Sequence, residues 1–579
     1  MDADSAATII PRTWAGVRAL KVSCQQDMTL CSFDTETFYA SVFAFGFCHP
    51  DGEVEINHGL KKDHISFFLD RLRAVPSRAG STIVCGAHYM LFDLGVLFWR
   101  TVAPLNPSSD RAPRQMNFSM LSHRAEIEFF MSRPCFARIR MDGRTYHLID
   151  TYSFFPMGLK KALKMLKCET QKKEKPSQLG KRIIPLSELR PYLSADCRGV
   201  LALLKEILVL HQKYEARLCV SLPQMSGRIL RRHYIKKDFP KPSRPLLAAG
   251  LLSYHGGKNA FPAHPGWYED CYDLDINSAY AEAMSKLPDF ERGRWKQGSG
   301  MSFFRDHPHG LYSVSGFLKD CPWGCLQSHD FRKAQGEIKK LWSTGYEIEE
   351  AVRSGEIRID DIRGFGFHLG RSRNKADENK KSAFARYVDE FYSLRKATKD
   401  PALKFFYKQL LVSPYGKLIQ RTENEDDEKV AGSMFDPGIA SLVTGFVRAK
   451  IHRLEHKYRA IHTATDGFIT QIKPDPADMG PDIGKLKCEW DYPGGKKGPA
   501  FGRVLILRNK LYLFYDQDGK LKKSGLHGFQ GKADELEKIW KSSSRKYKIT
   551  RLTTWGQAWH SGIPPGTEET VSRVLTLAR

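Results

Sequence analysis

The 579-residue sequence lacks any apolar run of the roughly 20 residues that a helix needs to span a bilayer. Its first residues, Met1-Asp2-Ala3-Asp4, also lack the basic segment followed by an apolar segment that marks a secretory signal. These two absences argue against a membrane protein and against an exported one. We therefore expect a protein that stays in the cytoplasm and has no membrane partner.

Cysteines at metal-binding spacing are also scarce. The sequence has twelve cysteines, and of these Cys321 and Cys325 lie close together, without a second pair or nearby histidines at zinc-finger spacing. A cytoplasmic location keeps such thiols reduced. We therefore expect reduced cysteines and no structural zinc site.

Negative charge is in short supply. The chain has 65 Asp and Glu residues against 90 Lys and Arg residues, which gives a formal net charge of +25. Such an excess attracts a polyanion through counterion release, although a merely basic, well-solvated surface would give the same count. Charge favours nucleic acid as a partner, but it does not separate an enzyme from a binding module.

The length exceeds what one compact core can hold, so we expect two or more folding units. Strand-like runs such as 30–33 and 82–85 alternate with helical patterns such as 201–214, which predicts an α/β unit at the start. A basic, proline-containing stretch at 235–242 then looks like a connector.

The second unit combines helical and strand patterns. Apolar residues recur at helical spacing from 382 to 411, and Asp400-Pro401 predicts a break between two helices there. The C-terminal part returns to strands, at 504–507 and 511–515. The sequence therefore predicts a multidomain α/β protein.

Acidic residues on three separated segments of the first unit form a possible metal site. Asp34 and Glu36 stand two apart on a strand and so point to the same side, which suits a divalent cation. Asp93 ends a second segment, and Tyr192 and Asp196 open a helix in a third. Four such carboxylates could hold two metal ions that activate water against a phosphodiester, whereas Asp34 and Glu36 alone are more often solvated surface.

This arrangement resembles the DEDDy 3′→5′ exonuclease domain of family B DNA polymerases, over roughly residues 25 to 215. The resemblance implies that the metal ligands and catalytic residues are Asp34, Glu36, Asp93 and Asp196. It also implies that Tyr192 orients the attacking water. One departure is Tyr89, which stands where the family usually has an Asn that holds the single-stranded primer end. We therefore expect an active nuclease with an altered grip on its substrate.

A second set of segments follows the connector. Asp275 stands where a strand turns into a helix, and Asp466 lies between two strand-like runs. Taken alone, Asp275 is better explained as a helix cap. A basic helical segment that ends at 408–417 lies between them in the sequence, and paired carboxylates with nearby cations are what nucleotidyl transfer needs.

The three segments resemble motifs A, B and C of family B DNA polymerases, in the family's order. The resemblance implies that Asp275 and Asp466 are the catalytic metal ligands and that Tyr280 stacks under the deoxyribose. It implies further contacts to the incoming nucleotide from Lys408, Arg395, Lys404 and Tyr415. Departures from the family pattern fall at Val412, Ala464 and Gly467, where we expect effects on fidelity and nucleotide affinity more than on activity.

Two short elements point to one branch of the family. Tyr254-His255-Gly256-Gly257 resembles the Tyr-x-Gly-Gly element of the protein-primed polymerases of linear-genome phages, and Lys510-Leu511-Tyr512 resembles their Lys-x-Tyr motif. The resemblance implies that DNA is bound by Tyr254, Gly256, Gly257, Lys510 and Tyr512. The stretch 288–370 matches in position the terminal-protein-binding insertion of that branch.

The resemblance implies a fold class and a division of the chain. We expect a ribonuclease H-like exonuclease domain followed by a right-hand polymerase domain of palm, fingers and thumb. The predicted divisions are the exonuclease at 1–225, a linker at 226–245, palm at 246–287, the insertion at 288–370, fingers at 371–418, palm again at 419–526 and a thumb at 527–579.

The same resemblance implies cofactors and partners. We expect two Mg²⁺ or Mn²⁺ ions in each active site, with primer-template DNA, dNTPs and a terminal protein primer as partners of a monomer that works in the host cytoplasm if the source is viral. Three alternatives stay open: a family B polymerase that uses ordinary primers or none, a nucleic-acid-binding protein with degenerate motifs, and an exonuclease with a decayed polymerase half.

Overall fold

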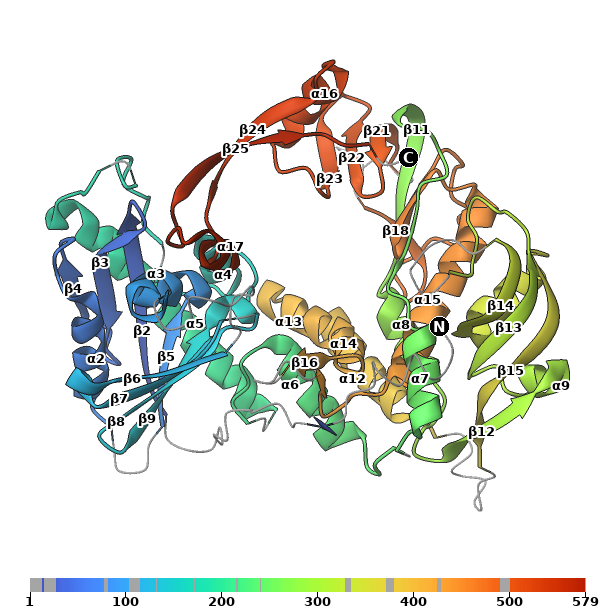
Figure 1. Ribbon diagram of the computed structural model, residues 1–579, viewed down its shortest axis with the longest axis horizontal. Helices are drawn as coiled ribbons and strands as arrows, with labels where there is room; N and C mark the ends of the chain where they lie inside the picture. Colours follow the sequence, from blue (N-terminus) through green and yellow to red (C-terminus); the bar gives the residue numbers. More distant parts are fainter. Residues whose placement is uncertain are drawn as a thin grey trace.

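The computed structural model is drawn in Figure 1. It describes residues 13–14, 28–77, 82–103, 115–131, 133–170, 172–180, 182–214, 217–239, 241–327, 335–370, 380–423, 429–489 and 500–577. Among these residues, no helix is both long and apolar enough to cross a membrane.

The first unit is a mixed sheet covered by helices. Its strands lie in the order β4-β3-β2-β5-β9-β8-β7-β6, with β2 antiparallel to β3 and parallel to β5, and β5 parallel to β9. The strand bounds are Met28–Phe38 (β2), Ser41–Cys48 (β3), Val54–His58 (β4), Thr82–Ala87 (β5), Gln115–Met120 (β6), Ala125–Phe130 (β7), Phe136–Met141 (β8) and Arg144–Asp150 (β9).

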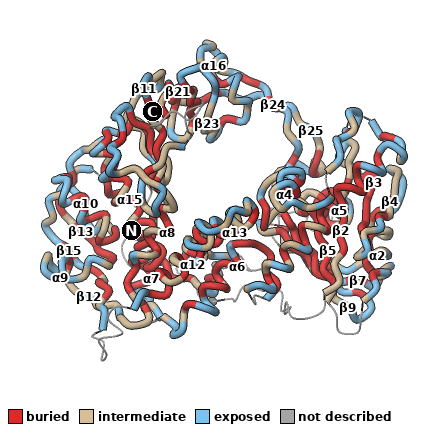
Figure 2. The backbone as a smooth tube through the Cα atoms, turned by 180° about the vertical axis from the view of Figure 1, so that it is seen from behind, coloured by how far each residue is buried: buried red, intermediate tan, exposed pale blue. Residues whose placement is uncertain are grey.

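Four helices accompany this sheet, and the longest lies against β2, β3 and β5. Their bounds are His64–Ala74 (α2), Met90–Val102 (α3), Leu159–Met165 (α4) and Leu186–Lys213 (α5). The packing of α5 is close, since a Cβ on Gly86 of β5 would lie 2.5 Å from the Leu204 side chain. The apolar faces meet in a buried core, which is red in Figure 2.

The stretch predicted as a linker is partly helical. It includes the end of α6 (Leu222–Ile229), the π-helical turn Leu230–Tyr234 and the start of α7 (Arg244–Ser253). Pro240, inside the predicted connector, lies outside the described residues. The part of the predicted linker without helical structure is therefore shorter than the sequence suggests.

The second unit is built on another sheet, with the order β10-β18-β19-β11-β21-β22-β23 and with β20 paired to β11. Its strands are Lys258–Ala260 (β10), Gly266–Ile276 (β11), His462–Thr465 (β18), Gly467–Thr470 (β19), Leu486–Cys488 (β20), Gly502–Arg508 (β21), Leu511–Asp516 (β22) and Leu521–Leu526 (β23). The buried helix α15 (Pro437–Tyr458) packs beside α7 and α8 (Ala279–Ser285). The strands predicted at 504–507 and 511–515 are confirmed.

A separate sheet of order β12-β15-β13-β14 lies on the outer side of α15 (Figure 1). The strands of this sheet and the helices between them are Gly293–Ser299 (β12), Gly300–Asp306 (α9), Gly310–Leu318 (β13), Gly336–Thr344 (β14), Gly345–Arg353 (α10) and Ile357–Leu369 (β15). The stretch predicted as an insertion, 288–370, thus folds around a small sheet and core of its own.

The two predicted helices after this sheet are confirmed. They are α12 (Ala383–Ala397) and α13 (Pro401–Val412), and the break falls where Asp400 caps α13 by accepting hydrogen bonds from the backbone N–H groups of Ala402 and Leu403. A short helix and two strands continue the chain, namely α14 (Pro414–Lys417), β16 (Arg421–Glu423) and β17 (Lys429–Ala431), the last paired with β1 (Thr13–Trp14).

The C-terminal part returns to the first unit. It contains α16 (Ala533–Lys541), β24 (Lys546–Leu552), α17 (Trp555–Ser561) and β25 (Glu568–Val574). Trp555 of α17 is buried edge-on against Trp99 of α3, with ring centroids 5.6 Å apart. Lys213 of α5 also donates a hydrogen bond to the Tyr407 hydroxyl of α13. The chain therefore closes into a ring of packed units, which Figure 1 shows.

Candidate active sites

The predicted carboxylates of the first unit come together at one end of β2. Asp34 and Glu36 lie on this strand, Asp93 lies in the first turn of α3, and Asp196 lies inside α5. Asp93 and Asp196 are almost fully buried. The hydroxyl of Thr35 donates a 2.6 Å hydrogen bond to Asp93, which joins α3 to β2.

The pKa values report how close these groups are. Burial raises the pKa of Asp34 well above its ordinary value, and the charges of Asp93, Glu36 and Asp196 raise it further. Burial likewise raises the pKa of Glu36 to about 7 and, against the hydrogen bond from Thr35, the pKa of Asp93 to about 8. Carboxylates that repel one another in this way need a cation between them to stay ionised.

Lys172 supplies one such cation, and the sequence did not reveal it. Its Nζ lies 2.5 Å from Asp196 Oδ2 and 5.1 Å from the centre of the Tyr192 ring. Lys172 belongs to a run of charged residues that looks like solvated surface, so its position next to the acids carries no local signal.

Tyr89, the departure from the family pattern, caps α3 in a left-handed conformation with φ 72°. Its backbone N–H donates to Asp150 at 2.9 Å, and its ring lies edge-on to Tyr152 and under the Arg133 guanidinium. The Tyr89 side chain therefore contacts an aromatic ring and a guanidinium beside the acids, and these contacts use its own aromatic ring, which an Asn lacks.

The residues present fit a hard divalent cation. All four predicted ligands are carboxylates, the class that Mg²⁺ and Mn²⁺ prefer. Asp196 Oδ1 is buried without a hydrogen-bond partner among the described residues, so it is available to an ion.

The second pair of predicted ligands lies on adjacent strands of the other sheet. Asp275 is on β11, and Asp466 stands at the turn between β18 and β19, where β19 pairs with β11. The backbone carbonyl of Asp466 accepts a hydrogen bond from Ile276 N at 3.0 Å. A Cβ on Gly467 would lie 3.3 Å from Asp275 Oδ1, so the glycine in this turn leaves room for the Asp275 carboxylate.

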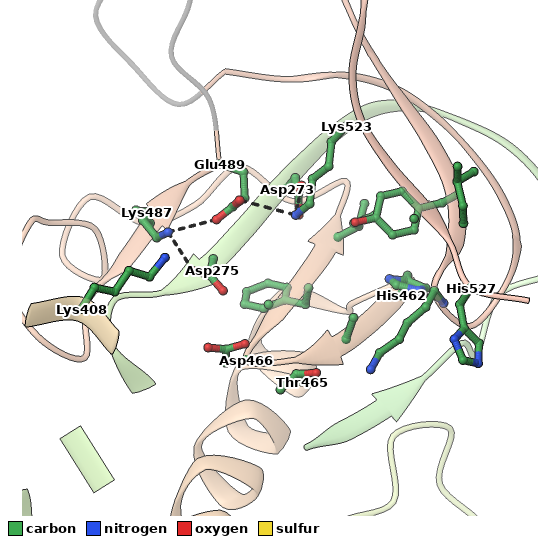
Figure 3. Close-up of a pocket in the computed structure, with 18 residues that line it drawn as sticks. Asp273, Asp275, Lys408, His462, Thr465, Asp466, Lys487, Glu489, Lys523 and His527 are labelled. Atoms are coloured by element: carbon green, nitrogen blue, oxygen red, sulfur yellow. Dashed lines mark hydrogen bonds and ion pairs between the residues drawn. The ribbon is translucent and has the colours of Figure 1, made fainter. Parts of the chain in front are cut away.

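A cavity of about 560 Å³ opens in front of these two acids. Figure 3 shows Asp275 and Asp466 side by side in it, with the Lys408 side chain of α13 reaching in from the neighbouring helix. Ala464, which replaces a family Asp, also lines this cavity.

The cavity holds four charged residues that the sequence analysis did not select. Lys487 lies 2.9 Å from Asp275 Oδ2 and 3.0 Å from Glu489, and Lys523 lies 2.7 Å from Asp273. Asp273 could have been found, because it stands two residues before Asp275 and so shares its face of β11. The other three come from strands far along the chain and carry no such signal.

Electrostatics here again indicates a cation site. Burial and then the charge of Asp275 raise the pKa of Asp466 to about 6. Burial also raises the pKa of Asp275, against the opposing effect of Lys487. Two carboxylates facing one another, with a lysine ion-paired to one of them, suit a divalent ion.

An aromatic stack adjoins the acids. The rings of Tyr280 and Tyr415 lie 4.5 Å apart and nearly parallel, and the charge of Asp466 acts on both hydroxyls. Arg395 of α12 donates a 3.1 Å hydrogen bond to the Ser278 hydroxyl beside motif A. Lys404 and Lys408 are exposed one turn apart on α13.

The remaining predicted residues lie on β22 or in the segments next to β10 and β22 of the same sheet. A Cβ on Gly257 would come within 2.5 Å of the Thr465 side chain, so this glycine allows close contact with the motif C turn. Gly256 accepts a hydrogen bond from Arg448, and Tyr254 acts electrostatically on Tyr280. Lys510 and Tyr512 line the far side of the cavity, where the backbone N–H of Lys510 donates to His462.

Comparison with known proteins finds a family model that matches part of the chain. Residues 185–431 match the model of DNA polymerase type B, organellar and viral. The DNA polymerase of Acidianus bottle-shaped virus (isolate Italy/Pozzuoli) is 25% identical over 289 residues, which are 47% of this chain and 40% of that relative. The chain therefore resembles the type B DNA polymerases over this part of its length. The DNA polymerases of this family use divalent metal ions, as both clusters of acids would require.

Solved structures extend the likeness beyond the family match. Phi29 DNA polymerase complexed with primer-template DNA and incoming nucleotide substrates superposes with a TM-score of 0.65 at 16% identity, over 95% of this chain and 100% of that one. The same polymerase with single-stranded DNA gives a TM-score of 0.59 at 17% identity, over 91% and 96%. The predicted fold class, a ribonuclease H-like unit followed by a right-hand unit, is confirmed.

Proposed function

We propose that this chain is a DNA-directed DNA polymerase with a proofreading 3′→5′ exonuclease site in its first unit. The observation that carries the proposal is the pair Asp275 and Asp466, held side by side in a cavity that also receives Lys408. By its likeness to the type B family, that cavity would take the primer 3′-hydroxyl and a deoxynucleoside triphosphate.

Each group in the cavity has a role that follows from its position. Divalent ions held by Asp275 and Asp466 would lower the pKa of the primer hydroxyl and neutralise the triphosphate. Lys408 reaches in from α13 and would bind the phosphates, with Arg395 and Lys404 behind it. Tyr280, stacked on Tyr415, would present a flat surface beneath the sugar that leaves no room for a 2′-hydroxyl.

The first unit would remove mispaired ends. Asp34, Glu36, Asp93 and Asp196 would hold two divalent ions at the scissile phosphodiester, and Tyr192 would orient the attacking water. Lys172 would keep Asp196 ionised as the site changes charge. Tyr89, packed on Arg133, would grip the single strand by stacking instead of by an amide hydrogen bond.

We assign the parts of the chain accordingly. The proposed exonuclease is residues 1–225, the palm is 246–287 with 419–526, the fingers are 371–418 and the thumb is 527–579. Tyr254, Gly256 and Gly257 would hold the template, while Lys510 and Tyr512 would hold the primer terminus.

Protein priming is the favoured mode of initiation. Its support is the Tyr-x-Gly-Gly element beside motif C together with the separately folded sheet within 288–370, which would bind the terminal protein. Nucleotide transfer to a hydroxyl of a protein encoded beside this chain would support that mode. Initiation that needs only an oligonucleotide would favour the alternative of an ordinary primer.

Primer extension tests the central proposal. The wild type should extend a labelled primer with Mg²⁺ and dNTPs, Asp466→Ala should lose synthesis but keep primer degradation, and Asp34→Ala should do the reverse. Asp270→Ala changes an exposed acid on the same strand as Asp275 and should leave both activities intact. A wild type that binds DNA but never extends it would refute polymerisation and favour the nuclease or binding-protein alternatives.

A further inference from the structure

Four side chains of metal-ligating types meet outside both clusters of acids. Cys321 follows β13 and Glu356 precedes β15 in the small outer sheet, while His452 and His456 stand one turn apart on α15. The Cys321 thiol, a Glu356 oxygen and a His456 ring nitrogen all lie within 4.8 Å of one another. His452 Nε2 lies 2.9 Å from the same Glu356 oxygen.

The distances between these atoms match a tetrahedral ion. Around zinc with ordinary bond lengths, two nitrogen or oxygen ligands lie about 3.3 Å apart, and a sulfur and a nitrogen about 3.6 Å apart. Here His456 Nε2 is 3.0 Å from Glu356 Oε1 and 3.7 Å from Cys321 Sγ. A slight outward movement of the two imidazoles from the carboxylate would admit the ion.

The buried histidine gives independent support. His452 is fully buried, and its Nδ1 lies 3.3 Å from the backbone carbonyl of Trp323 and 3.4 Å from the Nζ of Lys258. Its Nε2 faces the Glu356 oxygen at 2.9 Å, which is the distance of an ion pair when the imidazole is protonated. A divalent cation in place of that proton would hold the imidazole and the carboxylate together in the same way.

The surroundings orient the ligands as a metal site requires. The backbone N–H of Cys325 donates to Glu356 Oε2, which leaves Oε1 for the ion. The contact of His452 with the Trp323 carbonyl is the kind of outer interaction that fixes ligating histidines.

We propose that Cys321, Glu356, His452 and His456 form a structural zinc site that joins the outer sheet to α15. The mixed sulfur, nitrogen and oxygen ligands are those of zinc and not of Mg²⁺. The cysteine spacing in the sequence predicted no such site, because two of the four ligands stand on a helix more than a hundred residues downstream. The site goes beyond the proposed function, since it requires neither DNA nor nucleotide.

Metal analysis of the purified full-length chain tests the proposal directly. One tightly bound zinc per chain is expected in the wild type, and Cys321→Ser and His456→Gln should each lose it. Cys168→Ser changes a half-buried cysteine of the first unit and should keep it. Asp34→Ala and Asp466→Ala should keep it too, which separates this zinc from ions held by either active site.

Cobalt substitution tests the site in the wild type, so its result does not depend on whether a variant folds. Co²⁺ bound to the wild type should give a thiolate charge-transfer band in the near ultraviolet, and added zinc should remove it. Chelation of the zinc should lower the melting temperature, because the metal binds the folded state. Either a wild type without zinc and without this band, or zinc retained in both Cys321→Ser and His456→Gln, would overturn the proposal.

Discussion

Arg448 and Glu347 form an ion pair in which both side chains are only 1% exposed. Arg448 Nε lies 2.6 Å from Glu347 Oε1, and the arginine also donates to the backbone carbonyls of Gly256 and Cys325. Glu347 accepts further hydrogen bonds from Ser343 and Thr344. A single side chain of α15 thus links the outer sheet to the Tyr-x-Gly-Gly element.

Removing one partner of this pair should destabilise the chain strongly. Arg448→Met leaves a buried, uncompensated carboxylate, so we expect the unfolding free energy to fall by about 3–5 kcal/mol in urea titrations. Arg453→Ala removes an exposed arginine of the same helix from Glu350, which keeps its ion pair with Arg353, and should cost about 0–1 kcal/mol. Equal losses for the two variants would contradict this account of the buried pair.

Lys172 should matter for nuclease activity and not for synthesis. Lys172→Ala removes the cation at 2.5 Å from Asp196, so primer degradation should slow by about 100-fold while primer extension is unchanged. The neighbouring Lys173 is exposed, and Lys173→Ala serves as the control. Full degradation by Lys172→Ala would show that its position beside the acids is incidental.

Metal binding in the first unit should release protons at neutral pH. Because the pKa of Asp93 is raised to about 8 and that of Glu36 to about 7, much of this pair is protonated in the metal-free chain at pH 7. An ion requires the carboxylates, so its affinity should rise with pH up to about 8. Calorimetric titration with Mn²⁺ in buffers of different ionisation enthalpy measures the release.

The same pKa values set the sign of the stability change. A folded-state pKa above the unfolded value means that these two acids contribute most to the stability of the metal-free chain at low pH, and that this contribution is lost as pH rises from about 4 to about 8. Asp93→Asn should reduce the proton release, to which Glu36 and Asp34 still contribute, and Asp466→Ala should preserve it. Binding without any release at pH 7 would contradict the raised pKa values.

The contact between α17 and α3 should control how long the chain stays on DNA. Trp555→Ala removes the edge-on contact with Trp99, so products made in a single binding event should become shorter. Insertion of one nucleotide should be unaffected, because the contact is remote from Asp275 and Asp466. His560 is exposed on the same helix, and His560→Ala should behave as wild type; shortening in both variants would argue against a specific role for the Trp555 contact.

Strands and acids could be predicted where the pattern that indicates them lies within a few neighbouring residues of the sequence. Asp34 and Glu36 alternate on one strand, and Asp400-Pro401 marks a helix start by its own chemistry, so both were found from a few residues. Lys172 and Lys487 were missed because each is positioned by an acid elsewhere in the chain. The cluster around Glu356 was missed for the same reason, since its spacing exists only after α15 packs on the outer sheet.

The docking of α17 on α3 also has a topological consequence. Pro565 and Gly566, in the loop after α17, pack against Gly95 and Phe92 of α3, so the last unit is fastened to the first at more than one point. If DNA passes through the ring that this contact closes, a linear molecule can thread in from its end. A covalently closed circle could enter only when the contact between α17 and α3 opens. The closed ring would therefore favour DNA molecules with free ends, independently of their sequence.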